Sequence, residues 1–296
     1  MSKEVIWTNY GLDGAGCCLL LKWLRGNDIE IQYTTPRKFR DDFLKWQLEN
    51  SLTKYSRIYI ASLDLSKCLD VADKSNCVII DTHKTHNDKK HLYCDAKTAI
   101  VETSSTTRLI FRLFKNELIK KLTPKQIKLI GLIDDYISGK NKYKESNLLN
   151  ALYWGVNSDR LNQFINQFND GYYGFNQQQR NVINLHIKRI VKAVSELDIF
   201  QGIMPVKGKR YKVAATFAEN YFPEISNHLI NVYGIDIVMV VNMTLKTVYM
   251  QQRVTSDAPL HLIAEKLIEG GGSDRYAGGN LTSKFIEFTK TLQKIW

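Results

Sequence analysis

Acidic and histidine side chains follow three short apolar runs in the first half of the sequence. The runs and the polar residues after them are Glu4–Thr8 with Asp13, Arg57–Ala61 with Asp64, and Asn76–Ile80 with Asp81 and His83. Carboxylate oxygens and imidazole nitrogens are ligands for divalent ions such as Mg²⁺ and Mn²⁺. A fourth acidic candidate is the pair Asp134-Asp135. Carboxylates and imidazoles gathered at strand ends are what a pair of divalent ions would need.

The elements around these residues predict how they are brought together. The apolar runs read as buried strands, as does Ile29–Thr34, and helices are expected between them. The expected helices are Cys17–Leu24, Arg40–Leu48, Ser104–Phe114 and Pro124–Ser138, with a lysine-rich surface loop at Gly139–Ser146. Alternation of strands and helices predicts an α/β fold with a doubly wound parallel sheet. The carboxyl ends of its strands share one edge, where such sheets bind ligands.

The pattern changes in the second half of the chain. Asn176–Leu197 reads as one long helix, because its apolar residues recur at helical spacing. Strands are expected at Tyr211–Phe217, Ile235–Asn242 and Thr247–Arg253, with helices near Ala218–Tyr233 and at Pro259–Glu269. We therefore predict an N-terminal domain over residues 1–175, a connecting helix over 176–200, and a smaller α/β domain over 201–296.

Composition narrows the class of protein. The formal net charge of the 296 residues is +11, which favours nucleotides or nucleic acids as partners. Five cysteines, odd in number and without a CxxC pair, predict free thiols of a reducing compartment rather than disulfides or a zinc site. The start of the chain lacks an apolar signal region, and no run is long enough to cross a membrane. We expect a cytoplasmic protein that does not interact with membranes.

A glycine-rich segment near the C-terminus is a second candidate site. Gly270, Gly271 and Gly272 precede Ser273 and Arg275. Glycines reach backbone conformations that present successive N–H groups to an anion, and an arginine adds charge-assisted hydrogen bonds. The glycines at 11, 14 and 16 do not have the GxGxxG order of dinucleotide-binding folds, so a Rossmann cofactor site is rejected.

In their order and context these motifs resemble the DHH/DHHA1 phosphoesterases, and most closely the oligoribonuclease-like members. The family motif His-x-Asp-x-Asp-Gly matches residues 9–14 at Asp13 and Gly14, and the second-motif aspartate matches Asp64. Asp-His-His matches Asp81 and His83, and the fourth motif matches Asp134 or Asp135. Residues 270–279 resemble the DHHA1 signature Gly-Gly-Gly-His-x-x-Ala-Gly-Gly with one residue more, and Arg253 falls where the family places an arginine that meets substrate phosphate. The resemblance covers nearly the whole chain.

The departures from the family pattern concern its metal ligands. Asn9, Gly11 and Thr82 stand at ligand positions, and Ser273 replaces the histidine of the glycine loop. The resemblance leaves Asp13, Asp64 and one of Asp134 and Asp135 as metal ligands, with Asp81 and His83 as catalytic residues. We therefore expect at most one Mn²⁺ or Mg²⁺ ion, because the shared ligands of a two-ion centre are missing.

The function implied is that of a DHH/DHHA1-type homologue. It would bind short single-stranded oligonucleotides or nucleotides in an interdomain cleft, through Arg253, Gly270–Gly272, Ser273 and Arg275, with metal-dependent phosphodiester hydrolysis weakened or lost. Two alternatives stay open: an inactive homologue that binds nucleotides, nucleic acid or a protein, and a cyclic dinucleotide phosphodiesterase. The sequence leaves open whether the chain is an enzyme and whether it forms a homodimer.

Overall fold

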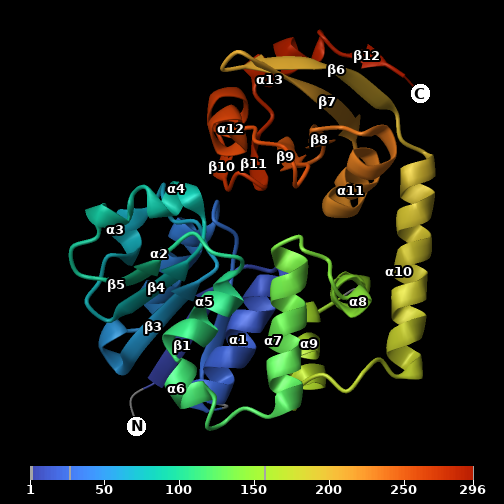
Figure 1. Ribbon diagram of the computed structural model, residues 1–296. Helices are drawn as coiled ribbons and strands as arrows, with labels where there is room; N and C mark the ends of the chain where they lie inside the picture. The colour runs from blue at the N-terminus through green and yellow to red at the C-terminus, as the bar shows by residue number, and fades with distance from the viewer. Residues whose placement is uncertain (1–2, 27, 157, 296) are drawn as a thin grey trace. The chain divides into compact units, whose positions relative to one another are not determined.

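The computed structural model describes residues 3–26, 28–156 and 158–295. The chain divides into two compact units, residues 1–186 and residues 187–296 (Figure 1). Within the described ranges, no helix is long and apolar enough to cross a membrane. Each unit has its own sheet and its own buried core.

The first unit contains a five-stranded sheet in the order β2-β1-β3-β4-β5, and every neighbouring pair of strands is parallel. The strands are β1 (Lys3–Thr8), β2 (Glu30–Tyr33), β3 (Tyr55–Ala61), β4 (Cys77–Asp81) and β5 (Lys97–Ile100). Four of them lie where the sequence predicts strands. The predicted α/β class is therefore confirmed, and β5 is the strand that the sequence pattern did not reveal. β5 is a short edge strand with polar residues at its start, so it lacks an apolar run.

Helices cover both faces of this sheet. On one face a large core forms among α1 (Leu12–Arg25), α5 (Thr106–Leu113), α7 (Pro124–Ile137), α8 (Lys144–Gly155) and α9 (Arg160–Phe168). On the other face an aromatic core involves α2 (Phe39–Glu49) and α3 (Leu69–Ala72), with Trp7 and Phe43 packed edge to face. The short segments α4 (Lys84–Asn87) and α6 (Lys115–Leu118) complete the unit.

One helix of this unit begins earlier than the sequence predicts, and another was not predicted from the sequence. α1 begins at Leu12 rather than Cys17, so Asp13 lies in the first turn of the helix. A Cβ on Gly14 would approach the carbonyl oxygen of Asn9 to 2.3 Å, which shows how closely α1 begins against the end of β1. α8 begins at Lys144, inside the segment predicted to be a loop. Lysine and glutamate are good helix formers, and the loop prediction gave their polarity too much weight.

The second unit contains a mixed sheet in the order β10-β11-β9-β8-β7-β6-β12. Its strands are β6 (Ile199–Val206), β7 (Lys209–Phe217), β8 (Ile237–Asn242), β9 (Thr247–Gln252), β10 (Gly271–Gly272), β11 (Tyr276–Asn280) and β12 (Gln293–Lys294). Only β7 and β8 run parallel among the pairs described. One face packs on α12 (Leu260–Ile268) and α13 (Ser283–Thr289), and the other on α11 (Phe222–Tyr233). α10 (Gln177–Ser195) spans the boundary between the units.

Candidate functional site

The first candidate site lies where the strand order of the parallel sheet reverses. β1 lies between β2 and β3, so the crevice for a ligand is expected at the carboxyl ends of β1 and β3. Asn9 follows β1 and contacts Ser62, which follows β3. Its side-chain amide donates to the carbonyl oxygen of Ser62 at 2.6 Å and to the Ser62 hydroxyl at 3.0 Å. Its side-chain oxygen accepts from the Gly11 N–H at 2.7 Å. The residue at the family histidine position thus links two strand ends.

The carboxylate of Asp13 is enclosed by hydrogen-bond donors. One oxygen accepts from the Ser62 hydroxyl at 3.0 Å and the Thr106 N–H at 2.9 Å. The other accepts from the Thr107 N–H at 2.9 Å and the Thr107 hydroxyl at 2.7 Å. Two of these donors are backbone N–H groups in the first turn of α5, which have no partner within the helix. A negative charge is stabilised at this end of a helix. Asp13 is 8% exposed, so in this structure its acceptor capacity is used by the protein itself.

Asp81, at the end of β4, joins two histidines. His83 Nδ1 donates to both carboxylate oxygens at 2.8 and 3.0 Å, and His86 Nδ1 donates to one of them at 2.7 Å. His86 Nε2 lies 2.9 Å from the Tyr93 hydroxyl. Burial lowers the pKa of His83, but the Asp81 carboxylate outweighs this effect and raises the pKa to about 9. For Asp81, burial raises the pKa, but His83 and His86 outweigh burial and hold the pKa well below its ordinary value. A protonated His83, with a side chain 34% exposed, therefore faces this region at neutral pH.

The other three predicted metal ligands fall in different places. Asp64 accepts from the Ser66 N–H at 2.9 Å and from the Thr85 hydroxyl. Asp134 accepts from the hydroxyls of Ser104 and Ser105, just before α5.

Asp135 has a separate role on the other side of α7. Its carboxylate accepts from the N–H groups of Lys142 and Tyr143 and from the Ser146 hydroxyl, at 3.1, 3.1 and 2.8 Å. Burial raises its pKa, and these hydrogen bonds outweigh burial and lower it. Asp135 thus holds the connection from α7 to α8. Of the two adjacent aspartates, Asp134 is the one that lies beside the residues around Asp13.

A metal centre of two ions does not fit these residues. Among the described residues, no group of three or more His, Cys, Asp or Glu side chains is arranged to hold an ion. The chemistry of the side chains gives the reason. Asn9 is committed to Ser62, Gly11 has no side chain, and Thr82 offers only a hydroxyl that lies 3.3 Å from the Thr106 hydroxyl.

The second candidate site is the β10–β11 hairpin of the second unit. Its glycines pack backbone against backbone. A Cβ on Gly270 would lie 2.1 Å from the Gly278 carbonyl oxygen, and one on Gly279 would lie 2.4 Å from the Ile268 carbonyl oxygen. Gly272 has a φ of +146°, which favours glycine. These glycines are therefore needed for close packing of the hairpin, whatever the hairpin binds.

The turn of the hairpin carries Ser273, Asp274 and Arg275. The Ser273 hydroxyl accepts from the N–H groups of Arg275 and Tyr276, both at 3.1 Å, so the serine organises the turn. His261 on α12 contacts the carboxylate of Asp274 through Nδ1. The Arg275 guanidinium lies 5.7 Å from the centre of the Tyr276 ring, and its Nε is buried without a hydrogen-bond partner among the described residues.

Arg253 follows β9, the strand that pairs with β11. Its guanidinium donates to the carbonyl oxygen of Ile230 at 3.3 Å and lies 3.9 Å from the Asp236 carboxylate. The side chain is thus held at the C-terminal end of α11, where a cation stabilises the helix. That Arg253 binds phosphate remains a prediction. In this structure its side chain also has a structural role at the end of α11.

Sequence reasoning overlooked the hydroxyl groups around Asp13 and the histidine on α12. The run Ser104-Ser105-Thr106-Thr107 held a signal for the first, because such residues are typical of a helix start. The Ser105 hydroxyl indeed accepts from the Arg108 N–H. His261 had no signal, because its partner Asp274 lies thirteen residues later and only the packing of α12 brings them together.

The arrangement of a parallel N-terminal sheet followed by a mixed sheet is the fold of the DHH-family phosphoesterases. The structure is similar to the pGpG-specific phosphodiesterase PggH from Vibrio cholerae, with a TM-score of 0.55 and 13% identity over 97% of this chain and 96% of that one. It is also similar to an exopolyphosphatase-related protein from Bacteroides fragilis, with a TM-score of 0.52 and 14% identity over 98% and 92% of the two chains.

A third similar structure is RecJ from Thermus thermophilus in complex with Mn²⁺. The TM-score is 0.53 at 9% identity, over 98% of this chain and 51% of RecJ, so this chain spans about half of that protein. No family model and no curated protein matches the sequence. At these identities the similarities establish the fold, and they confirm the resemblance inferred from the motifs at that level.

Proposed function

We propose that this chain binds short single-stranded oligonucleotides or nucleotides through their phosphates, and that its metal-dependent hydrolysis of phosphodiester bonds is weakened or lost. The fold is that of the DHH-family phosphoesterases, and the net charge of +11 favours an anionic ligand. The name of the similar Vibrio cholerae protein describes an enzyme specific for pGpG, a linear dinucleotide. A dinucleotide is therefore the first ligand to test.

The observation that carries the binding proposal is the buried Nε of Arg275. A buried donor without a partner costs free energy, and the cost disappears when a ligand supplies an acceptor. The positive charge of the guanidinium makes an anion the favoured acceptor. The hairpin turn that carries Arg275 is the part of the sequence that matches the substrate-binding loop of the DHHA1 domain.

The proposal of weak hydrolysis is supported by the surroundings of Asp13. Its carboxylate accepts four hydrogen bonds from the protein, so binding an ion requires that some of them break. Asp64 and Asp134 accept fewer. We therefore propose that at most one Mn²⁺ or Mg²⁺ ion binds, and that it binds weakly.

Binding of pGpG and of di- to pentanucleotides by the full chain tests the proposal, together with the Arg275→Gln variant. We expect wild type to bind, the affinity to fall as salt rises, and Arg275→Gln to weaken binding about tenfold or more. Arg210→Gln is the matched control, because Arg210 is an exposed arginine on β7 away from the hairpin. If both variants weaken binding equally, the effect comes from net charge alone. That result would contradict the proposal that the hairpin binds the ligand.

Arg275 is a sharper probe than Arg253 in this experiment. Replacing Arg253 also removes a cation from the end of α11, so a loss of binding could follow from a local change in structure. Hydrolysis is measured on the same oligonucleotides with Mn²⁺. Rapid cleavage by wild type would contradict the weakened site and leave the binding proposal intact.

A further inference from the structure

A cavity of about 290 Å³ lies within the first unit, in the segment that joins α9 to α10. Two glycines with left-handed backbones shape it. Gly171 has a φ of +99°, and a Cβ there would lie 2.5 Å from the backbone of Lys125, so the segment packs tightly on the start of α7. Gly174 has a φ of +92° and would place a Cβ in open space. The segment is thus packed against α7 at Gly171, whereas no atoms crowd it at Gly174.

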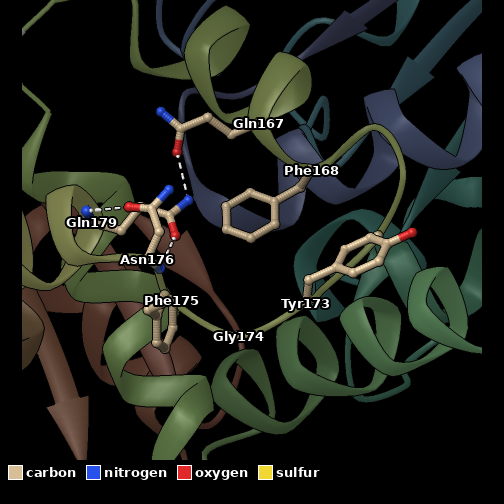
Figure 2. A pocket seen from close by; sticks show the side chains of 8 residues that line it. Gln167, Phe168, Tyr173, Gly174, Phe175, Asn176 and Gln179 are labelled. Atoms are coloured by element: carbon tan, nitrogen blue, oxygen red, sulfur yellow. Dashed lines mark hydrogen bonds between the residues drawn. The ribbon is translucent and has the colours of Figure 1, made fainter.

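Aromatic rings form part of the cavity wall (Figure 2). Phe168 is almost completely buried, whereas Tyr173 is 66% exposed. The ammonium group of Lys125 lies 3.4 Å from the centre of the Tyr173 ring and covers one of its faces. The other face of an exposed ring is a platform on which a flat aromatic ligand stacks.

Side-chain amides form another part of the wall, and Figure 2 shows them beside the Phe168 ring. The Gln179 side-chain oxygen accepts from the backbone N–H of Asn176 at 2.9 Å. The Asn176 side-chain oxygen accepts from the backbone N–H of Gln179, also at 2.9 Å. Gln179 then donates through its amide group to the side-chain oxygen of Gln167 at 3.2 Å. These bonds connect the amide of Gln167, at the end of α9, to those of Asn176 and Gln179 at the start of α10.

The oriented amides retain donors for a ligand. Among the described residues, the side-chain NH₂ groups of Gln167 and Asn176 have no hydrogen-bond partner. Asn and Gln amides form two hydrogen bonds with adenine: the NH₂ group donates to N7, and the amide oxygen accepts from N6. The oxygens of Gln167 and Asn176 each accept one bond from Gln179 and keep a second lone pair for this contact. The cavity therefore offers both kinds of contact that a base makes, stacking on its face and hydrogen bonds at its edge.

The cavity is separate from the strand ends around Asp13. It lies at the N-terminal end of α7, where Lys125 contacts Tyr173, whereas Asp134 lies near the other end of that helix. Nine residues of helix separate these two positions, which corresponds to about 14 Å. A volume of about 290 Å³ is at the lower end of the roughly 300–1,000 Å³ of small-molecule sites, so it suits a single base rather than a peptide segment.

We propose that this cavity binds the base of a nucleoside, adenine by preference, stacked beside Tyr173 and hydrogen-bonded by the amides of Gln167 and Asn176. This inference goes beyond the proposed function, because the site needs no phosphate.

The test uses adenosine, which lacks a phosphate, titrated into the full chain by calorimetry and by NMR of the Gly171 and Gly174 amides. We expect binding of adenosine ahead of cytidine and uridine, with shifts at both glycines. Tyr173→Ala should weaken it about tenfold or more, whereas Tyr173→Phe should not. Gln167→Glu keeps the oxygen that accepts from Gln179 and removes the donor, so a loss of about tenfold is expected. Tyr143→Ala removes an exposed tyrosine of the same unit outside the cavity and should change nothing.

Three outcomes would overturn the inference. The first is no binding of adenosine by wild type at millimolar concentration. The second is binding that neither Tyr173→Ala nor Gln167→Glu weakens. The third is binding of a proline-rich peptide, which also docks on aromatic side chains, if it shifts the two glycine signals when adenosine does not. These outcomes are distinct from those for Arg275: if adenosine binds but Arg275→Gln leaves oligonucleotide binding unchanged, only the proposed function fails.

Discussion

The strand ends of the first unit and the hairpin of the second unit both match family motifs, but they differ in how far their polar groups are satisfied. Around Asp13, backbone N–H groups and hydroxyls already fill the carboxylate oxygens. At the hairpin, the Arg275 Nε is buried and has no partner in the described part of the chain. A group that is satisfied internally stabilises the fold, and one that is left unsatisfied favours a ligand. The comparison shows that the carboxylate of Asp13 serves the fold, whereas the Arg275 guanidinium keeps a buried donor that an anion could satisfy under the function proposed above.

The largest effect is expected from rebuilding the metal ligands. Asn9→His, Gly11→Asp and Thr82→His together should raise Mn²⁺-dependent cleavage of short oligonucleotides by at least about 100-fold, because bound metals supply the nucleophile and stabilise charge. Gly11 has a φ of −85°, so aspartate is tolerated there. The nearest obstacle is the Asn9 side-chain oxygen at 3.0 Å from the new Cβ, and the first substitution removes it.

Adding Asp64→Ala to this triple variant is the control, and it should abolish the activity gained. A triple variant that folds and binds two ions by calorimetry but cleaves nothing would show that the substrate class is wrong. Two tight Mn²⁺ sites in the wild-type chain would contradict the comparison directly.

The second prediction concerns Asp13 as a structural residue. Asp13→Asn should lower the free energy of unfolding by about 3 kcal/mol, because the amide turns an NH₂ group towards donors at the start of α5. Urea denaturation measures this change. Asp134→Asn should cost about 1 kcal/mol or less, since the serine hydroxyls that it meets can rotate to accept. Equal costs for the two variants would argue against a special structural role of Asp13.

The third prediction separates close packing from ligand binding at the hairpin. Gly279→Ala should destabilise the second unit by about 1–3 kcal/mol, because its Cβ would approach the Ile268 carbonyl oxygen to 2.4 Å. Gly278→Ala is a matched control one residue away, where the nearest atom is at an ordinary 3.6 Å. Thermal unfolding of both variants would sharpen the comparison. A stable Gly279→Ala variant that loses oligonucleotide binding would instead assign that glycine to the ligand.

The smallest effect is a pH dependence from the pair of Asp81 and His83. The pKa of folded His83 is raised to about 9, so its contribution to stability is fully present below the unfolded pKa of about 6.5 and is lost as pH rises through 9. Solvent screening of the partly exposed ring reduces the size of the effect. The melting temperature should fall modestly from pH 7 to pH 9.5, and His83→Gln should flatten that decline. An NMR titration with a His83 pKa near 6.5 would contradict the ion pair.

Much of the fold could be predicted because buried strands and amphipathic helices leave periodic patterns. β1, β3 and β4 coincide with apolar runs, and α10 with a run of apolar residues at helical spacing. β5 and β6 were missed for a physical reason. The first is a short edge strand, and the second interrupts its apolar residues with Gln201, Gly202 and Pro205, so neither shows a continuous apolar run.

The sequence by itself determined the order of the motifs and the type of residue at each family metal position, since Asn9, Gly11 and Thr82 carry neither a carboxylate nor an imidazole whatever the fold. Only the tertiary structure decided how the remaining carboxylates are used. Asp134 and Asp135 are adjacent in sequence, yet the turn of α7 sends one to the serines before α5 and the other to the start of α8. Asp13 meets Thr106 and Thr107 across more than 90 residues. Hydrogen bonds between distant segments depend on packing, and a local pattern does not encode them.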